Sequence, residues 1–227
     1  KSARQRLARN SMADMRAILQ HAVTGPGFGE RLVQFWGDHF TVAANGPILR
    51  VLAPDVVDNA VRPNISGRFS DMLRAVTLHP GMLVYLNQVQ SFGPNSKAGK
   101  RTGKGLNENL AREILELHTL GVGAGYAQKD VRSFANLLTG LSADKGGFKF
   151  RNGLVEPGQH TVLGRVYDGK LPGIEKALED IAMHPDTARH LAVKLVTHFI
   201  GGTPDPEHVD HMAQAYLASN GDLLKIY

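Results

Sequence analysis

Residues 106–121 read LNENLAREILELHTLG, and this stretch decides the fold class. At about 100° per residue, its apolar side chains gather on one arc of a helical wheel and its charged side chains gather on the other. That pattern predicts an amphipathic helix of roughly four turns. Asn107 is expected to cap the start of this helix with its side-chain oxygen, and Gly121 is expected to end it.

His118 is the one polar residue in the middle of the apolar arc. A buried imidazole needs a hydrogen-bond partner, because an unpaired polar group costs roughly 1–3 kcal/mol. One interpretation is a core histidine bonded to a backbone carbonyl. The other is a catalytic or ligand-binding histidine, since titratable groups in buried sites are often functional. The sequence leaves both interpretations open.

Residues 28–43 predict a second amphipathic helix, whose buried arc includes Phe35 and Phe40. His39 falls inside the same arc, so two helices each carry one histidine on the buried face. If His39 and His118 meet, they form a candidate site, with the central helix offering groups to orient a base. The wheel, however, places the carboxylates of that helix away from its histidine. The candidate catalytic residues are His39, His118, Arg112, Glu113 and Glu116.

The pair His-Pro occurs twice, at residues 79–80 and 184–185. A residue before proline is disfavoured in the helical conformation, and proline favours the first position of a new helix. Both pairs therefore predict a corner between two helices, with the histidine bonded to backbone groups rather than performing chemistry. The surrounding residues 66–89 and 173–200 are consistent with an internal pseudo-repeat.

Residues 146–168 differ in kind from the rest of the chain. Phe148 and Phe150 alternate with basic residues, and Asn152-Gly153 is a turn signal between short apolar runs. We therefore predict a mainly α fold, a multi-helix bundle with a small β-hairpin insertion around 146–168, in a single domain over residues 1–227. Further helices are predicted at residues 2–22, 54–61, 69–78, 127–138 and 204–218.

The composition limits the kinds of chemistry available. The 227 residues include no cysteine, which excludes disulfides, thiolate metal sites and cysteine nucleophiles. No apolar run is long enough to span a membrane. His208 and His211 have a spacing that can bind a metal, but no third ligand is in view. We therefore predict no metal and no cofactor.

Charge is distributed unevenly along the chain. Residues 1–112 carry 15 Lys and Arg against 7 Asp and Glu, whereas residues 113–227 carry 11 against 14. Within the first half, the polar, glycine-rich residues 91–105 contain four cations, of which residues 97–104 are the basic part. We read this segment as a surface loop, with binding of an anionic ligand at 97–104 as the alternative. Nucleic acid is not the expected partner, because the chain shows no recognised nucleic-acid-binding motif.

The motifs above resemble those of the bacterial domain-of-unknown-function family 1800. The resemblance implies a largely helical bacterial group whose members are often predicted to be exported, and it implies no activity that can be transferred. A periplasmic or extracellular location is expected from this resemblance alone. The segments that carry it are residues 35–40, 79–86, 106–121, 126–140, 157–164 and 184–199.

This chain also departs from the pattern of that family. Relatives often carry a histidine where Gly37 stands, a His-Asp pair where Val155-Glu156 stands and a tryptophan where Leu141 stands. If those positions form a reactive site in relatives, this chain has lost part of it. The polar residues that remain on family positions are His39, Asn107, Asn109, Arg112, Glu113, Glu116 and His118.

Two functions are therefore weighed. The first is a helical scaffold or interaction module, with an unidentified protein partner, in an exported bacterial protein. The second is a hydrolase-like enzyme in which His39 or His118 acts as the base and Glu113 or Glu116 orients it. Because both ends of the chain read as interrupted helices, we expect it to be part of a longer protein.

Overall fold

The computed structural model describes residues 27–145 and 147–227, so the helix predicted at 2–22 lies outside the described residues. The fold is mainly α with a small β insertion, as predicted. The longer helices are α2 (Gly27–His39), α4 (Phe69–Thr77), α8 (Gln128–Leu137), α9 (Leu171–Ala182), α10 (Pro185–Phe199) and α11 (Pro206–Ala218). The shorter ones are α3 (Leu49–Val56), α5 (Pro80–Tyr85), α6 (Lys97–Thr102) and α7 (Asn109–Glu113).

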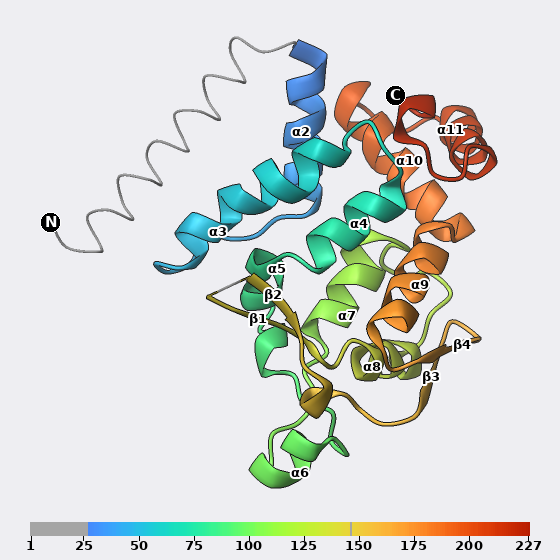
Figure 1. Cartoon of the computed structure of the whole chain (residues 1–227). Coiled ribbons are helices and arrows are strands. Elements are labelled where there is room, and N and C mark those ends of the chain that lie inside the picture. The colour runs from blue at the N-terminus through green and yellow to red at the C-terminus, as the bar shows by residue number, and fades with distance from the viewer. Residues whose placement is uncertain (1–26, 146) are drawn as a thin grey trace, which may run out of the picture.

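The stretch that reads as the central helix lies in the middle of the molecule (Figure 1). It begins as α7 and continues directly as the π-helical segment η4 (Ile114–His118). As predicted, the Asn107 side chain accepts a hydrogen bond from the backbone N–H of Asn109, at 2.9 Å. Gly121 ends the segment with a φ of 92°, and its N–H bonds to the carbonyl of Leu115. The apolar arc packs into the main core, where Leu110, Ile114 and Leu115 are fully buried.

Both His-Pro pairs form the predicted corners between helices. His79 ends the connection from α4 to α5, and its Nδ1 accepts a hydrogen bond from the N–H of Gly81 at 3.0 Å. His184 does the same between α9 and α10, where its Nδ1 accepts from Asp186 at 3.2 Å. Each imidazole therefore acts as the N-cap of the helix that follows it.

The β insertion consists of two small hairpins. Strand β1 (Leu141–Asp144) pairs with β2 (Gly147–Phe150), and β3 (Gln159–Val162) pairs with β4 (Arg165–Asp168), both antiparallel. The predicted turn at Asn152-Gly153 was wrong, because these residues belong to the 3₁₀ helix η5 (Asn152–Leu154). Phe148 and Phe150 pair with residues that precede them, so that hairpin turns before the aromatic residues rather than after them.

Two other segments differ from their prediction. The helix predicted at 54–61 begins earlier, as α3, and continues as the π-helical segment η1 (Val57–Val61) and the 3₁₀ helix η2 (Arg62–Asn64). Pro54 lies inside α3 instead of starting a helix, which removes one backbone hydrogen bond at a half-buried position. The segment 91–105, read as a plain surface loop, contains α6.

The remaining connections are short. They include the 3₁₀ helices η3 (Gln88–Gln90) and η6 (Leu223–Lys225). Among the described residues, no helix is both long and apolar enough to cross a bilayer.

Candidate functional site

His39 closes α2 and reaches the end of the central helix. Its Nε2 lies 3.0 Å from the carbonyl oxygen of His118, and its Nδ1 lies 2.8 Å from the Nζ of Lys194. The first contact requires an N–H donor on Nε2, and the second leaves Nδ1 as the acceptor for the ammonium group. His39 is therefore held as the neutral Nε2–H tautomer, with both ring nitrogens occupied. Only 5% of the residue is exposed.

His118, the last residue of η4, is also buried, with 4% exposed. Its ring centroid lies 6.0 Å from that of His39 and 5.0 Å from that of Phe40. The predicted bond to a backbone carbonyl is made by His39 and not by His118, whose ring has no hydrogen-bond partner among the described residues. Burial, together with the nearby charge of Lys194, lowers the pKa of His118 to about 3.

Helix α10 supplies two residues that completed the site without being predicted. His190 places its Nε2 3.3 Å from the carbonyl oxygen of Leu117, and Lys194 contacts His39. Gly121 leaves room for the imidazole of His190, since a Cβ at residue 121 would lie 2.8 Å from Nδ1 of that ring. The site is the His–Lys cluster, and its members are His39, His118, His190 and Lys194.

The His–Lys cluster satisfies backbone groups that a helix end leaves free. The last carbonyls of any helix have no partner within the helix. Here, two of them, on Leu117 and His118, are met by imidazoles from α10 and α2. The hydroxyl of Thr119 donates to the carbonyl of Ile114 at 2.6 Å. Helices distant in the sequence are thus joined at one point.

The electrostatics of the His–Lys cluster favour uncharged imidazoles. Burial lowers the pKa of His39 well below its ordinary value, and the positive charge of Lys194 lowers it further. Burial also lowers the pKa of His190. The pKa of Lys194 is lowered by burial too, although the carboxylate of Asp38 opposes this shift. No carboxylate hydrogen-bonds to any of the four within the described part of the chain.

The other predicted site residues lie on a different face of the central helix. Arg112 pairs with Glu116 at 2.9 Å, and its guanidinium also donates to the side-chain oxygen of Gln128. Burial raises the pKa of Glu113, and the neighbouring Glu116 adds to the shift. The structure therefore brings His39 and His118 together. It leaves Arg112 paired with Glu116 away from both rings, with Glu113 near Glu116.

A pocket of about 550 Å³ lies between α2 and α3, close to the His–Lys cluster but not part of it. Its lining includes Gly37, Asp38 and Phe40, and His39 is not among the lining residues. The bidentate pair of Arg62 with Glu30, with contacts of 2.5 and 3.2 Å, also lies in its wall. The wall is mostly apolar, and it does not bring a carboxylate to either buried histidine.

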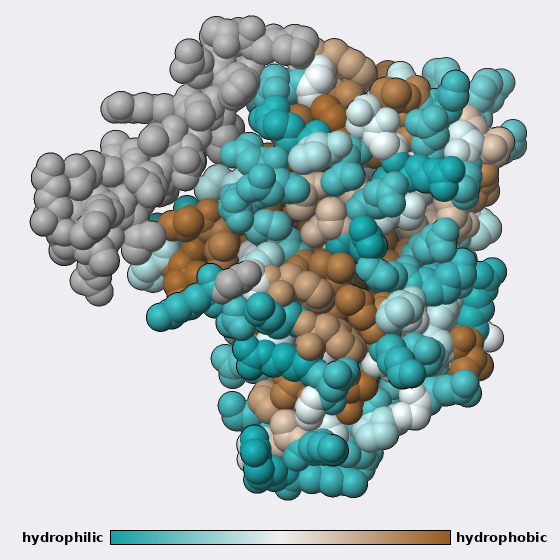
Figure 2. All heavy atoms as spheres, viewed as in Figure 1, coloured by the Kyte–Doolittle hydropathy of each residue, from teal (hydrophilic) through white to brown (hydrophobic). Residues whose placement is uncertain are grey.

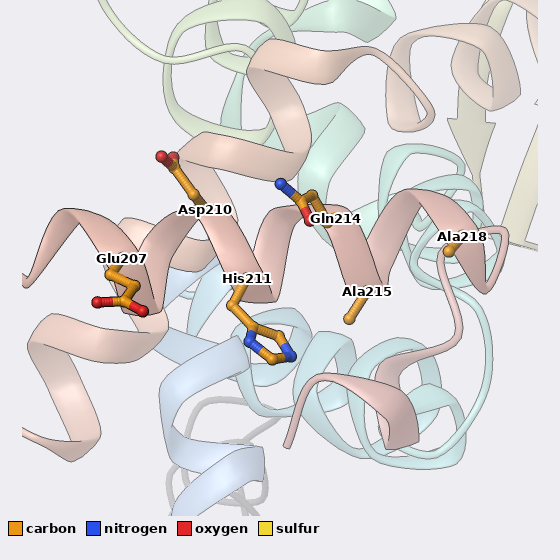
Figure 3. Close-up of a pocket in the computed structure, with 6 residues that line it drawn as sticks. All are labelled: Glu207, Asp210, His211, Gln214, Ala215 and Ala218. Carbon is orange, nitrogen blue, oxygen red and sulfur yellow. The ribbon is translucent and has the colours of Figure 1, made fainter.

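A second pocket lies along α11 (Figure 3). Glu207, Asp210 and His211 are among its lining residues, and Asp210 also pairs with Arg189. His208 is not among the lining residues. Within residues 27–145 and 147–227, no group of three or more His, Cys, Asp or Glu side chains is placed to hold a metal ion.

The fold and the His–Lys cluster define a helical domain whose buried polar groups join its helices. The chain belongs to the family described as "Protein of unknown function (DUF1800)", which matches residues 1–227. Neither the comparison with curated proteins nor the comparison with solved structures found a match.

Proposed function

We propose that this chain is a helical scaffold that acts as an interaction module for another protein. The scaffold is one domain, and this is supported by a hydrophobic core that includes residues from α2 to η6. In the same proposal, the protein is bacterial and is exported to the periplasm or beyond, which rests on the family resemblance. Fractionation of cells that express the full-length protein would test the location.

The observation that carries the proposal is the bonding of His39. Both of its ring nitrogens are engaged, one by a backbone carbonyl and one by Lys194. A general base needs a free lone pair within reach of substrate and a pKa near the working pH. The pKa of His118 is about 3, which makes it a poor proton acceptor at neutral pH. The bonding of His39 is therefore structural, and His118 is a weak base.

The alternative is a hydrolase that uses His39 or His118 as the base. The observation in its favour is that the two rings share one cluster, 6.0 Å apart, as a joint site would require. Against it, the carboxylates of Glu113 and Glu116 do not orient either ring, and the neighbouring charge is a cation. A cation beside a base weakens its affinity for a proton.

An activity screen separates the two functions. Wild type and His118→Leu are assayed against nitrophenyl esters, phosphates and glycosides, with melting temperatures recorded in parallel. The scaffold proposal predicts no hydrolysis that depends on His118. Turnover by the wild type that disappears in His118→Leu, with an unchanged melting temperature, would establish the enzyme instead.

A further inference from the structure

Residues 91–105 form a projection at one end of the molecule, which we name the basic loop. Helix α6 is its outermost element, away from the His–Lys cluster (Figure 1). The surface at this end is predominantly hydrophilic (Figure 2). Ser96 caps α6 by accepting from the N–H of Gly99, and Gly103 ends it with a φ of 68°.

The basic loop is closed at its neck. The N–H of Phe92 donates to the carbonyl of Gly105 at 3.0 Å, and the N–H of Asn107 donates to the hydroxyl of Ser91 at 3.1 Å. Gly99 packs so tightly that a Cβ there would lie 2.2 Å from the carbonyl oxygen of Gly93. Because the closed loop is already ordered, it loses less conformational entropy when a partner binds.

A buried carboxylate fastens the basic loop to the body of the protein. The carboxylate of Glu156 accepts from the backbone N–H and the side-chain amide of Asn95, at 2.8 and 2.6 Å. The N–H of Glu156 bonds in turn to the hydroxyl of Thr139. The N–H of Gly93 donates to the carbonyl of Leu154 at 2.9 Å. Both carboxylate oxygens of Glu156 are therefore occupied by hydrogen bonds from Asn95.

The outer side of the basic loop carries positive charge only. Lys97, Lys100 and Arg101 have the i, i+3, i+4 spacing that places side chains on one face of a helix. Lys104 follows and lies 5.2 Å over the ring of Phe92. All four cations are exposed, residues 91–105 contain no Asp or Glu, and within the described structure none of the four forms an ion pair.

We propose that the basic loop docks an acidic protein segment, which names the partner of the interaction module proposed above and rests on that proposal. Cations four residues apart on a helix are about 6 Å apart along its axis, a spacing that carboxylates at i and i+4 of a partner helix can match. A membrane is the weaker fit, because the loop has no large exposed apolar side chain to insert. Nucleic acid is also weaker, since Phe92, its one aromatic residue, is half-buried.

The test measures binding of fluorescently labelled poly-L-glutamate by anisotropy at low and at physiological salt. One variant neutralises the loop, as K97Q/K100Q/R101Q/K104Q. The matched control, K129Q/R132Q/K149Q/K170Q, removes the same charge from four exposed sites elsewhere. Each exposed ion pair contributes little, but the loss of four of them adds up, so we expect neutralising the loop to weaken binding by about ten-fold or more. The control variant should weaken binding by less than about two-fold. Binding should weaken with added salt.

A third variant, Asn95→Ala, keeps every cation and removes the side-chain amide bond to Glu156, while the backbone N–H of residue 95 still donates to that carboxylate. It should weaken binding by about three-fold, because the loop then loses one of the contacts that hold it in place before binding. Equal losses in both quadruple variants, or no binding by the wild type, would refute the proposal. So would loop-dependent binding that is tighter to phosphatidylglycerol vesicles or single-stranded DNA. None of these results bears on hydrolysis, by which the scaffold proposal itself is judged.

Discussion

Replacing His39 should damage the protein more than replacing His118, although both histidines are buried on apolar arcs. His39→Leu removes the donor to the carbonyl of His118 and the acceptor of Lys194. An orphaned buried carbonyl alone costs roughly 1–3 kcal/mol, so with Lys194 also unpaired we expect a loss of about 2–4 kcal/mol in the free energy of unfolding. In a protein of this size, that loss lowers the melting temperature by about 5–15 °C.

His118→Leu should have a much smaller effect. The His118 ring has no hydrogen bond to lose among the described residues, and its backbone carbonyl is kept by the substitution. Leucine is similar in volume and can pack against Phe40, so the free energy of unfolding should change by less than about 1 kcal/mol. Urea unfolding of both variants, followed by circular dichroism, measures the difference. A loss in His118→Leu equal to or larger than that in His39→Leu would refute this reasoning.

Three further results are expected. The pKa values of the buried imidazoles in the His–Lys cluster lie below the unfolded value of 6.5, so the unfolded chain binds more protons. Stability should be full above pH 6.5 and fall on acidification, by about 1.4 kcal/mol per pH unit for each such imidazole, in urea titrations between pH 7 and 4. Gly121→Ala should lower the melting temperature more than Gly123→Ala, because both glycines have positive φ but only Gly121 has His190 beside it. Equal losses would contradict the idea that the His190 ring packs against Gly121. His79→Ala should cost about 1 kcal/mol, as loss of an N-cap does, while His79→Asn restores most of it by capping Gly81.

Much of the fold could be predicted because local patterns decide it. The central helix, its Asn107 cap, its Gly121 end and both His-Pro corners all follow from residues near each other in the sequence. The turn of the second hairpin was missed because Leu163 adopts a φ of 49°, which an apolar residue seldom does. Asn152-Gly153 is the opposite case. Its residues are typical of a hairpin turn, but they lie in a 3₁₀ helix.

Two of the four residues of the His–Lys cluster could be predicted from the sequence. The apolar arcs of two helices placed His39 and His118 inward, and the structure brings them together. Lys194 and His190 could not be found in this way, because their role depends on how α10 packs against the end of η4. A pattern within one helix says which face is buried, but not which distant helix covers it. A lysine and a histidine four residues apart on a mixed helical face read as ordinary surface residues.

The central claim is that the His–Lys cluster is a structural joint with neutral imidazoles, and the protonation states of the rings test it most directly. Long-range ¹H–¹⁵N correlation spectra of histidine-labelled protein report which ring nitrogen carries the proton. We predict that His39 is the Nε2–H tautomer at neutral pH, and that His118 stays neutral down to a pH near 3 for as long as the protein is folded. Titration of either ring near pH 6.5, with a mixture of tautomers, would contradict the account.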